Sequence, residues 1–500
     1  MRAEAETKTS PWRGRSALRS GLLTGLSYLT LSGAGALAGV YLAHTFGRNE
    51  ETDGFMAAYG VYLVLVLGAQ AFRMVVVPDL TRAEADGKLA SEFRAYAVAF
   101  LAIAVPVSAV VAVLPGFFGE LITGRLPHSS AVIAGRALAW LVPAAFLQLL
   151  AGLAASALAA RDRYGAAAAG YALGGITSLA FFVLAAAAHG LISLAWGLLL
   201  AGSVTLALPL GGLFHGGGRI GHLRGGGFEI RRRLTRLAFG VAVPLAVQGL
   251  YVIALRFAAG TGEGNVTSLS YAYLLAAMFV SATAFSLSLI SAASLTRRGT
   301  DPEAAAAHVV HAAWISLAIV GAASGIVAVV GGRFITWALG QDYAGDVGEE
   351  LGRLVVYLAP WMVASAAFSI VYPLLFVMHR TRFLVPLAAA AVLLDVPISI
   401  AARAWGGLTG VAVALGISTL LLVVGLMAAL GSRVLLLSAI GLARLSLVVL
   451  AAAALAFGGA SLLLAAVPAA VLGVVVYTAI LVVIRELGLA DAWHYVRALH

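Results

Sequence analysis

The sequence has no cysteine and few charged residues. Lysine, arginine, aspartate and glutamate together make up 11% of the 500 residues, less than half of the roughly 25% found in soluble domains. Without cysteine the chain has no disulfide framework, no thiolate metal site and no cysteine nucleophile. So little charge excludes a soluble enzyme and an intrinsically disordered chain.

Apolar residues, by contrast, make up 62% of the chain, against about 45–50% in soluble proteins. A helix that crosses the hydrocarbon core of a bilayer needs about 20 apolar residues, whereas the strands of an outer-membrane barrel alternate polar and apolar ones. The long apolar runs therefore predict an all-α polytopic membrane protein. Fourteen such segments lie near 22–46, 54–77, 95–122, 132–160, 164–188, 190–214, 237–259, 266–295, 305–331, 351–379, 383–402, 406–430, 434–457 and 462–486.

Basic residues gather on one side of these segments. The tail at 1–20 is basic and leads into a first helix without a cleavage site. Loops on the same side carry Arg82, Lys88, Arg94, Arg161, Arg163, a cluster at 219–236, Arg297, Arg298, Arg380 and Arg382. The positive-inside rule makes this side cytoplasmic, and an even number of spans returns the C-terminus to it. The net charge of +10 thus indicates membrane orientation rather than nucleic-acid binding.

The chain repeats itself after six segments. The positions Ala58-Tyr59, Ala71-Phe72 and Arg82 recur at similar spacing as Ala272-Tyr273, Ala284-Phe285 and Arg297. Because six is an even number, both halves enter from the same side and form parallel repeats, as in alternating-access transporters. We expect two six-helix lobes around a central cavity, at 21–214 and 237–432, joined by a cytoplasmic linker at 215–236. Two further helices and a cytoplasmic tail occupy 433–500.

Several short motifs, taken in order, resemble a known family. They are Phe46-Gly47, Asp53-Gly54-Phe55, Ala58, Val77-Pro78, Gly190-Leu191, Leu194-Ala195-Trp196-Gly197, Gly264-Asn265-Val266, Leu269, Tyr271-Ala272, Gly407-Leu408 and Gly410-Val411-Ala412. The resemblance is to the MviN-like lipid II flippases, a branch of the multidrug/oligosaccharidyl-lipid/polysaccharide (MOP) exporter superfamily. It implies a bacterial inner-membrane flippase for a polyprenyl-(pyro)phosphate-linked glycan, either lipid II or a related cell-wall or polysaccharide precursor. Expected partners are this substrate, membrane lipids and cell-wall or polysaccharide assembly proteins.

The sequence departs from the family at the arginines thought to grip the pyrophosphate. Family members carry them in span 1, in the outer half of span 2 and just after the Tyr-Ala of span 8. Here residues 21–46 contain no arginine, span 2 has none before Arg73, and Tyr273 and Leu274 follow Ala272. The identity of the lipid-linked cargo therefore stays open, and a family member that has lost transport is an alternative.

Few charged residues lie within the predicted spans, and two of them stand out. An ionisable group in the membrane costs about 2.5–3.5 kcal/mol on insertion scales, which makes it a candidate for function. Asp395 lies midway along 383–402, and Arg256 lies in the outer half of 237–259. Asp395 is a candidate site for a coupling Na⁺ or H⁺, and Arg256 is a candidate contact for a lipid pyrophosphate. In the alternative, the two side chains pair with each other.

Other polar residues are weaker candidates. Gln70, Gln148 and Gln248 bond either sugar hydroxyls or a neighbouring helix. Arg73 either contacts phosphate in an inward-open cavity or reaches the cytoplasmic headgroups. Asp53 either closes an outer gate against a basic group or is a solvated loop acid.

Other functions fit the composition less well. A drug or cation exporter of the same superfamily usually has twelve spans and cavity carboxylates. A membrane glycosyltransferase or ligase needs a large outer loop, and the loop at 332–350 is short; a non-transporting scaffold is a further alternative. We expect no enzymatic activity and no cofactor. We also expect no metal site, since His308 and His311 lack a further ligand pair.

Overall fold

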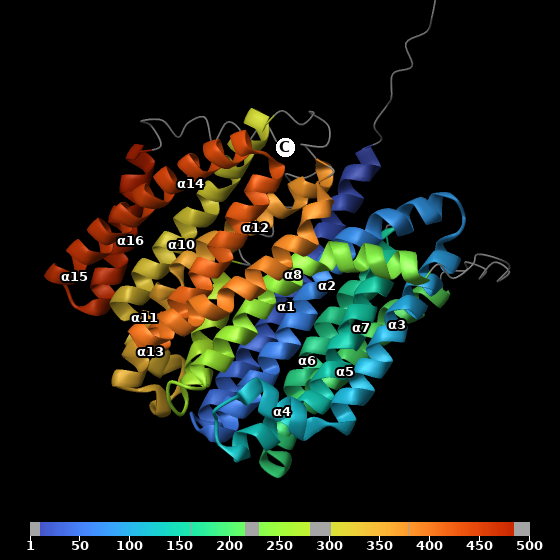
Figure 1. The fold of residues 1–500 in the computed structure, drawn as a ribbon, viewed down its shortest axis with the longest axis horizontal. Helices are drawn as coiled ribbons and strands as arrows, with labels where there is room; N and C mark the ends of the chain where they lie inside the picture. The colour runs from blue at the N-terminus through green and yellow to red at the C-terminus, as the bar shows by residue number, and fades with distance from the viewer. Residues whose placement is uncertain (1–10, 162, 216–229, 281–301, 379, 485–500) are drawn as a thin grey trace, which may run out of the picture. The chain divides into compact units, whose positions relative to one another are not determined.

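The chain folds into membrane-spanning helices. The computed structural model describes residues 11–161, 163–215, 230–280, 302–378 and 380–484, and these ranges contain helices and no strand (Figure 1). Ten of the described helices are long and apolar enough to cross a membrane. The prediction of an all-α polytopic membrane protein is therefore confirmed.

Within each described range, consecutive helices are joined by short connections. The first eight are α1 (Pro11–Phe46), α2 (Glu50–Ala85), α3 (Leu89–Val113), α4 (Pro115–Thr123), α5 (His128–Ala159), α6 (Gly165–His189), α7 (Ile192–His215) and α8 (Ile230–Ala258). The helix Asn265–Val280 comes next. The others are α10 (Pro302–Leu339), α11 (Asp346–Tyr357), α12 (Ala359–Val377), α13 (Leu384–Leu430), α14 (Ser432–Ala453), α15 (Gly459–Leu463) and α16 (Ala466–Ile484). Short turns of 3₁₀-helix (Gln341–Tyr343, Thr381–Phe383) and a π-helix (Ala454–Gly458) lie between some of these.

Helix α13 is continuous over 47 residues but bends sharply at Gly407. At 1.5 Å per residue it would be about 70 Å long, more than twice the roughly 30 Å hydrocarbon core. Gly407 has a φ of 56°, a left-handed conformation that glycine adopts without steric cost. The bend falls where the sequence predicts one span to end and the next to begin, between 383–402 and 406–430.

The expected outer loop at 332–350 is largely helical. Helix α10 continues to Leu339 and α11 begins at Asp346. Residues Leu351, Leu354 and Val355 of α11 are buried, whereas its first turn is acidic. A helix with one apolar face lacks a continuous apolar run, which is why the hydropathy pattern places only its second half in a span.

The described chain groups into two units. The first comprises residues 1–42, 65–115 and 136–237, and the second comprises 43–64, 116–135 and 238–500. The lobe boundaries from the internal repeat divide the chain differently and stay a prediction. Some parts of these predictions lie outside the described residues: residues 216–229 of the linker expected at 215–236, the basic pair Arg297 and Arg298, residues 1–10 of the N-terminal tail and residues 485–500 of the C-terminal segment.

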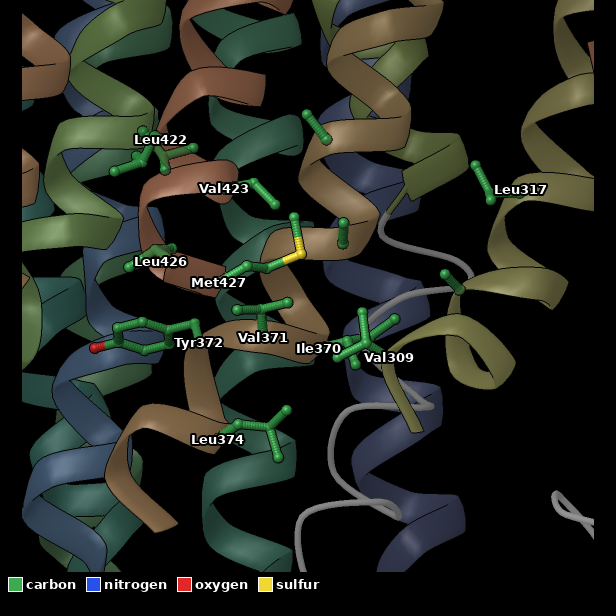
Figure 2. Packing of buried hydrophobic residues seen from close by; sticks show 14 of the residues in the cluster. Val309, Leu317, Ile370, Val371, Tyr372, Leu374, Leu422, Val423, Leu426 and Met427 are labelled. Carbon is green, nitrogen blue, oxygen red and sulfur yellow. The ribbon is translucent and has the colours of Figure 1, made fainter. Parts of the chain in front are cut away.

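The core of the second unit lies between α10, α12 and α13. Figure 2 shows Ile370, Val371 and Leu374 of α12 beside residues of α13 such as Leu422, Val423, Leu426 and Met427. The Tyr372 hydroxyl donates a hydrogen bond to the carbonyl of Gly240 in α8. Helix α10 also packs against α14 and α16, and the Tyr477 hydroxyl of α16 donates to the Ala318 carbonyl at 2.8 Å.

Replacing Gly325 with alanine should loosen the packing of α10 against the C-terminal helices. A methyl group at Gly325 would overlap the Phe457 ring, which cannot move away freely in a packed interface. We expect a loss of about 1–3 kcal/mol, typical of overpacking, measured as a lower thermal unfolding midpoint in detergent. The matched control is Gly459→Ala, because no atom lies within 4 Å of a methyl group there. Equal midpoints for the two variants would contradict this account.

Candidate functional site

A buried carboxylate at the start of α2 holds the start of the helix Asn265–Val280. Asp53 lies in the first turn of α2 and is 0% exposed. Its carboxylate accepts hydrogen bonds from the Gly264 amide at 2.6 Å, the Thr267 amide at 2.8 Å and the Thr267 hydroxyl at 2.6 Å. The first amides of a helix have no partner within the helix. Asp53 therefore caps a helix that starts far along the chain.

Arg48 also donates hydrogen bonds to the first turn of this helix. Its Nε donates to the Gly264 carbonyl and to the Ser268 hydroxyl, both at 3.0 Å. Its Nη2 donates to the Asn265 side-chain oxygen at 2.6 Å. We name the six residues Arg48, Asp53, Gly264, Asn265, Thr267 and Ser268 the Asp53 clasp. All six belong to the second unit.

Burial and the neighbouring groups have opposite effects on the pKa of Asp53. This residue lies just before the apolar segment expected at 54–77. Burial raises the pKa of the Asp53 carboxyl above its ordinary value. The hydrogen bonds from Thr267 and Gly264 and the positive charge of Arg48 act in the opposite direction. Asp53 is the acceptor in all three hydrogen bonds, so these contacts favour the ionised carboxylate.

Contacts beside the Asp53 clasp hold the neighbouring backbone close. The His44 ring nitrogen lies 3.1 Å from the Ala338 carbonyl, and the Tyr343 hydroxyl donates to the Gly47 carbonyl at 3.3 Å. The Ser130 hydroxyl donates to the carbonyl of Glu50 at 2.7 Å. Gly54 lies so close to the Ser130 backbone that any side chain there would overlap it.

An aromatic cluster of the same unit lies farther along the helix Asn265–Val280 and on α8 and α12. The Tyr251 and Tyr273 rings stack with centroids 3.7 Å apart, and the Trp361 ring lies 4.6 Å from that of Tyr273. The Tyr273 hydroxyl donates to the Gln248 side-chain oxygen at 2.8 Å. We name Gln248, Tyr251, Ser270, Tyr273 and Trp361 the aromatic cluster. Gln248 is thus the only one of the predicted headgroup contacts that the described residues place among these rings.

Asp395 is buried in α13 with only part of its hydrogen-bonding capacity used. It is 1% exposed, and the Ser399 hydroxyl donates to one of its oxygens at 3.5 Å. The Ser418 hydroxyl lies beside it without the geometry of a hydrogen bond, and the second carboxylate oxygen has no partner among the described residues. Ser418 also lines a small cavity of about 110 Å³.

The remaining candidates lie apart from these groups. Arg256 is exposed near Gly124, and no ion pair among the described residues joins it to Asp395. Gln148 is buried in α5, in the first unit. Gln70 and Arg73 belong to α2, but their side chains lie outside the described residues. The described part of the chain contains no group of three metal-ligating side chains.

A comparison of the sequence with models of known protein families assigns the chain to a family. The model of the family described as lipid II flippase MurJ matches residues 42–483. The chain belongs to the MurJ family. A comparison with curated protein sequences finds no match.

Solved structures share the fold at low sequence identity. A lipid II flippase MurJ in an inward closed conformation is 16% identical, with a TM-score of 0.70 over 93% of this chain and 99% of that one. A multidrug resistance MATE family transporter of the MOP superfamily is also similar. Its inward-facing structure is 16% identical with a TM-score of 0.56, covering 84% of this chain and 94% of that one. An outward-facing structure of a multidrug resistance MATE family transporter is 13% identical with a TM-score of 0.55, covering 86% of this chain and 96% of that one.

Within this MurJ-family fold, the sequence pointed to Asp53 but not to its partners. Asp53 stands in a family-like motif, whereas Gly264 contributes a backbone amide that no side-chain pattern reveals. Apart from Gln248, the members of the aromatic cluster were missed as well. The one available signal was the internal repeat, in which Ala58-Tyr59 recurs as Ala272-Tyr273.

Replacing Asp53 with asparagine should weaken the start of the helix Asn265–Val280. The asparagine amide would face backbone donors with a donor of its own and would lack the negative charge. We expect a loss of about 1.5–3 kcal/mol, the range for hydrogen bonds to a charged group. Hydrogen exchange at Gly264 and Thr267 should accelerate accordingly. Asp346→Asn, at an exposed acid in the first turn of α11, is the control; unchanged exchange at both amides in Asp53→Asn would refute the capping role.

Proposed function

We propose that this MurJ-family chain moves a polyprenyl-(pyro)phosphate-linked glycan, lipid II or a related precursor, across the bacterial cytoplasmic membrane. The family match over residues 42–483 is the observation that carries this proposal. The protein acts as a transporter without enzymatic activity, and its partners are membrane lipids and proteins of cell-wall or polysaccharide assembly. The lipid-linked headgroup passes between two lobes while the isoprenoid tail stays in lipid.

The proposed topology has fourteen spans with both termini in the cytoplasm. Counting α13 as two passes, and adding α1, α2 and the helix Asn265–Val280 to the candidate spans, gives this number. The even number agrees with the basic residues on the side of the N-terminal tail. The parallel lobes at 21–214 and 237–432 then enclose the central cavity.

The Asp53 clasp serves as the outer gate in this proposal. Arg48 and Asp53 precede the first lobe's second span, whereas Gly264 and Thr267 begin a span of the second lobe. The hydrogen bonds between them hold the lobes together on the side opposite the basic loops. Release of a headgroup on that side requires these bonds to break.

A disulfide cross-link between positions 53 and 267 of the clasp tests whether the gate must open. The chain has no cysteine, so Asp53→Cys with Thr267→Cys creates a single pair of thiols where the two side chains now touch. We expect oxidation to abolish headgroup transport in proteoliposomes and reduction to restore it. The two single-cysteine variants should not respond to oxidant. Full transport by the cross-linked protein would show that the clasp need not open.

Asp395 is the proposed site of a coupling Na⁺ or H⁺. Its free carboxylate oxygen and the Ser399 and Ser418 hydroxyls form an all-oxygen set, which suits a hard cation or a proton. One charge moved through the membrane potential supplies about 2.3 kcal/mol per 100 mV. Arg256, Arg73, Gln70, Gln148 and Gln248 are proposed contacts for the headgroup.

Asp395→Asn should uncouple transport from the ion gradient. A tenfold gradient of the coupling ion provides about 1.4 kcal/mol, so wild-type transport should accelerate when that gradient is imposed on proteoliposomes. The variant should transport at one rate with or without it, since an amide binds neither a proton nor Na⁺ as a carboxylate does. Asp346→Asn should behave as wild type. Gradient dependence that persists in Asp395→Asn would rule out this coupling site.

A further inference from the structure

The aromatic cluster contains polar atoms that the described structure leaves unused. Tyr251, Trp361 and Ser270 are buried, with 1%, 3% and 0% of their surface exposed. Neither the Tyr251 hydroxyl nor the Trp361 indole nitrogen has a hydrogen-bond partner among the described residues, and the Ser270 hydroxyl lies beside Tyr251 without the geometry of a bond. Buried polar groups without partners cost stability, and each calls for an explanation.

The chemistry of the cluster fits a neutral polar ligand. The described contacts of its side chains involve tyrosine, tryptophan, serine and glutamine, and no basic group. Aromatic faces with a few directed hydrogen-bonding groups form sites for ligands that are apolar on one side and polar on the other. A sugar ring has this character, with C–H groups on its faces and hydroxyls at its edges. A pyrophosphate would need cationic partners instead.

Two members of the cluster, Ser270 and Tyr273, lie on the helix whose start the Asp53 clasp caps. Tyr273 follows Asn265 by eight residues in one helix, roughly 12 Å at 1.5 Å per residue. Tyr251 comes from α8 and Trp361 from α12, so three helices converge on the stack. With Tyr251 stacked on Tyr273 the ring faces are closed. Separation of α8 from the helix Asn265–Val280 exposes both the ring faces and the unused polar atoms.

We propose that the aromatic cluster recognises the sugar of the lipid-linked substrate, with Tyr251, Ser270 and Trp361 supplying hydrogen bonds to its hydroxyls. This inference rests on the proposed flippase function and adds the part of the substrate that the site selects. Tyr251 and Ser270 are specificity-determining residues in this scheme. The phosphate groups are held elsewhere.

The test removes single polar atoms from the cluster and compares the binding and transport of two lipids. Tyr251→Phe and Ser270→Ala keep the shape of the cluster, and Tyr477→Phe is the matched control because its hydroxyl has a partner, the Ala318 carbonyl. Binding of lipid II and of a polyprenyl pyrophosphate without sugar is measured on the purified protein in detergent. Transport of both lipids in proteoliposomes and thermal unfolding midpoints are recorded for the same variants.

We expect Tyr251→Phe and Ser270→Ala to weaken lipid II binding about two- to tenfold, as for one lost neutral hydrogen bond, and to leave binding of the sugar-free lipid unchanged. Their unfolding midpoints should be unchanged or higher, since a buried unpaired group is removed. Tyr477→Phe should lower the midpoint without changing the preference between the two lipids.

Equal weakening for both lipids, unchanged lipid II binding in Tyr251→Phe, or no wild-type preference for lipid II would overturn the proposal. A wild-type protein that binds lipid II in preference to the sugar-free lipid but transports neither would refute the flippase function. The effect of Tyr251→Phe on that binding would still decide the role of the aromatic cluster.

Discussion

The structure depends on a helix cap that comes from another helix. Helix starts usually receive their cap from a side chain of the N-cap residue itself. Here Gly264 precedes the helix Asn265–Val280 and has no side chain, so Asp53 bonds the amides of Gly264 and Thr267 instead. These are the two amides that a capping box satisfies. A local element of the second unit is therefore complete only while the start of α2 lies against it.

The sequence predicted the elements that lipid constrains directly. Apolar runs for α5, α6 and α7 were visible because a span must be apolar along most of its length. Helix α11 was half missed, since its first turn is acidic at Asp346 and Glu349 and only its second half continues the apolar run expected at 351–379. The Asp53 clasp could be anticipated at one end only. Its other end is backbone, and tertiary packing alone decides which amides a carboxylate meets.

The two buried aspartates contrast in a way that separates their roles. Asp53 accepts three hydrogen bonds and has an arginine beside it, whereas Asp395 accepts one long bond from Ser399 and keeps one oxygen free. A fully satisfied polar network rigidifies the state in which it forms. An incompletely satisfied carboxylate favours whatever cation or proton completes it. The first arrangement suits a gate and the second suits a binding site.

The same contrast between satisfied and unsatisfied polar groups extends to the aromatic cluster. In the described conformation the Asp53 clasp is satisfied while Tyr251 and Trp361 are not. In the proposed open state the capping bonds are lost, and separation of α8 from the helix Asn265–Val280 makes the ring faces and polar atoms available to a ligand. A ligand shifts such an equilibrium only through its different affinity for the two states. Unpaired groups in the closed state supply that difference, since a sugar satisfies them only after the helices separate.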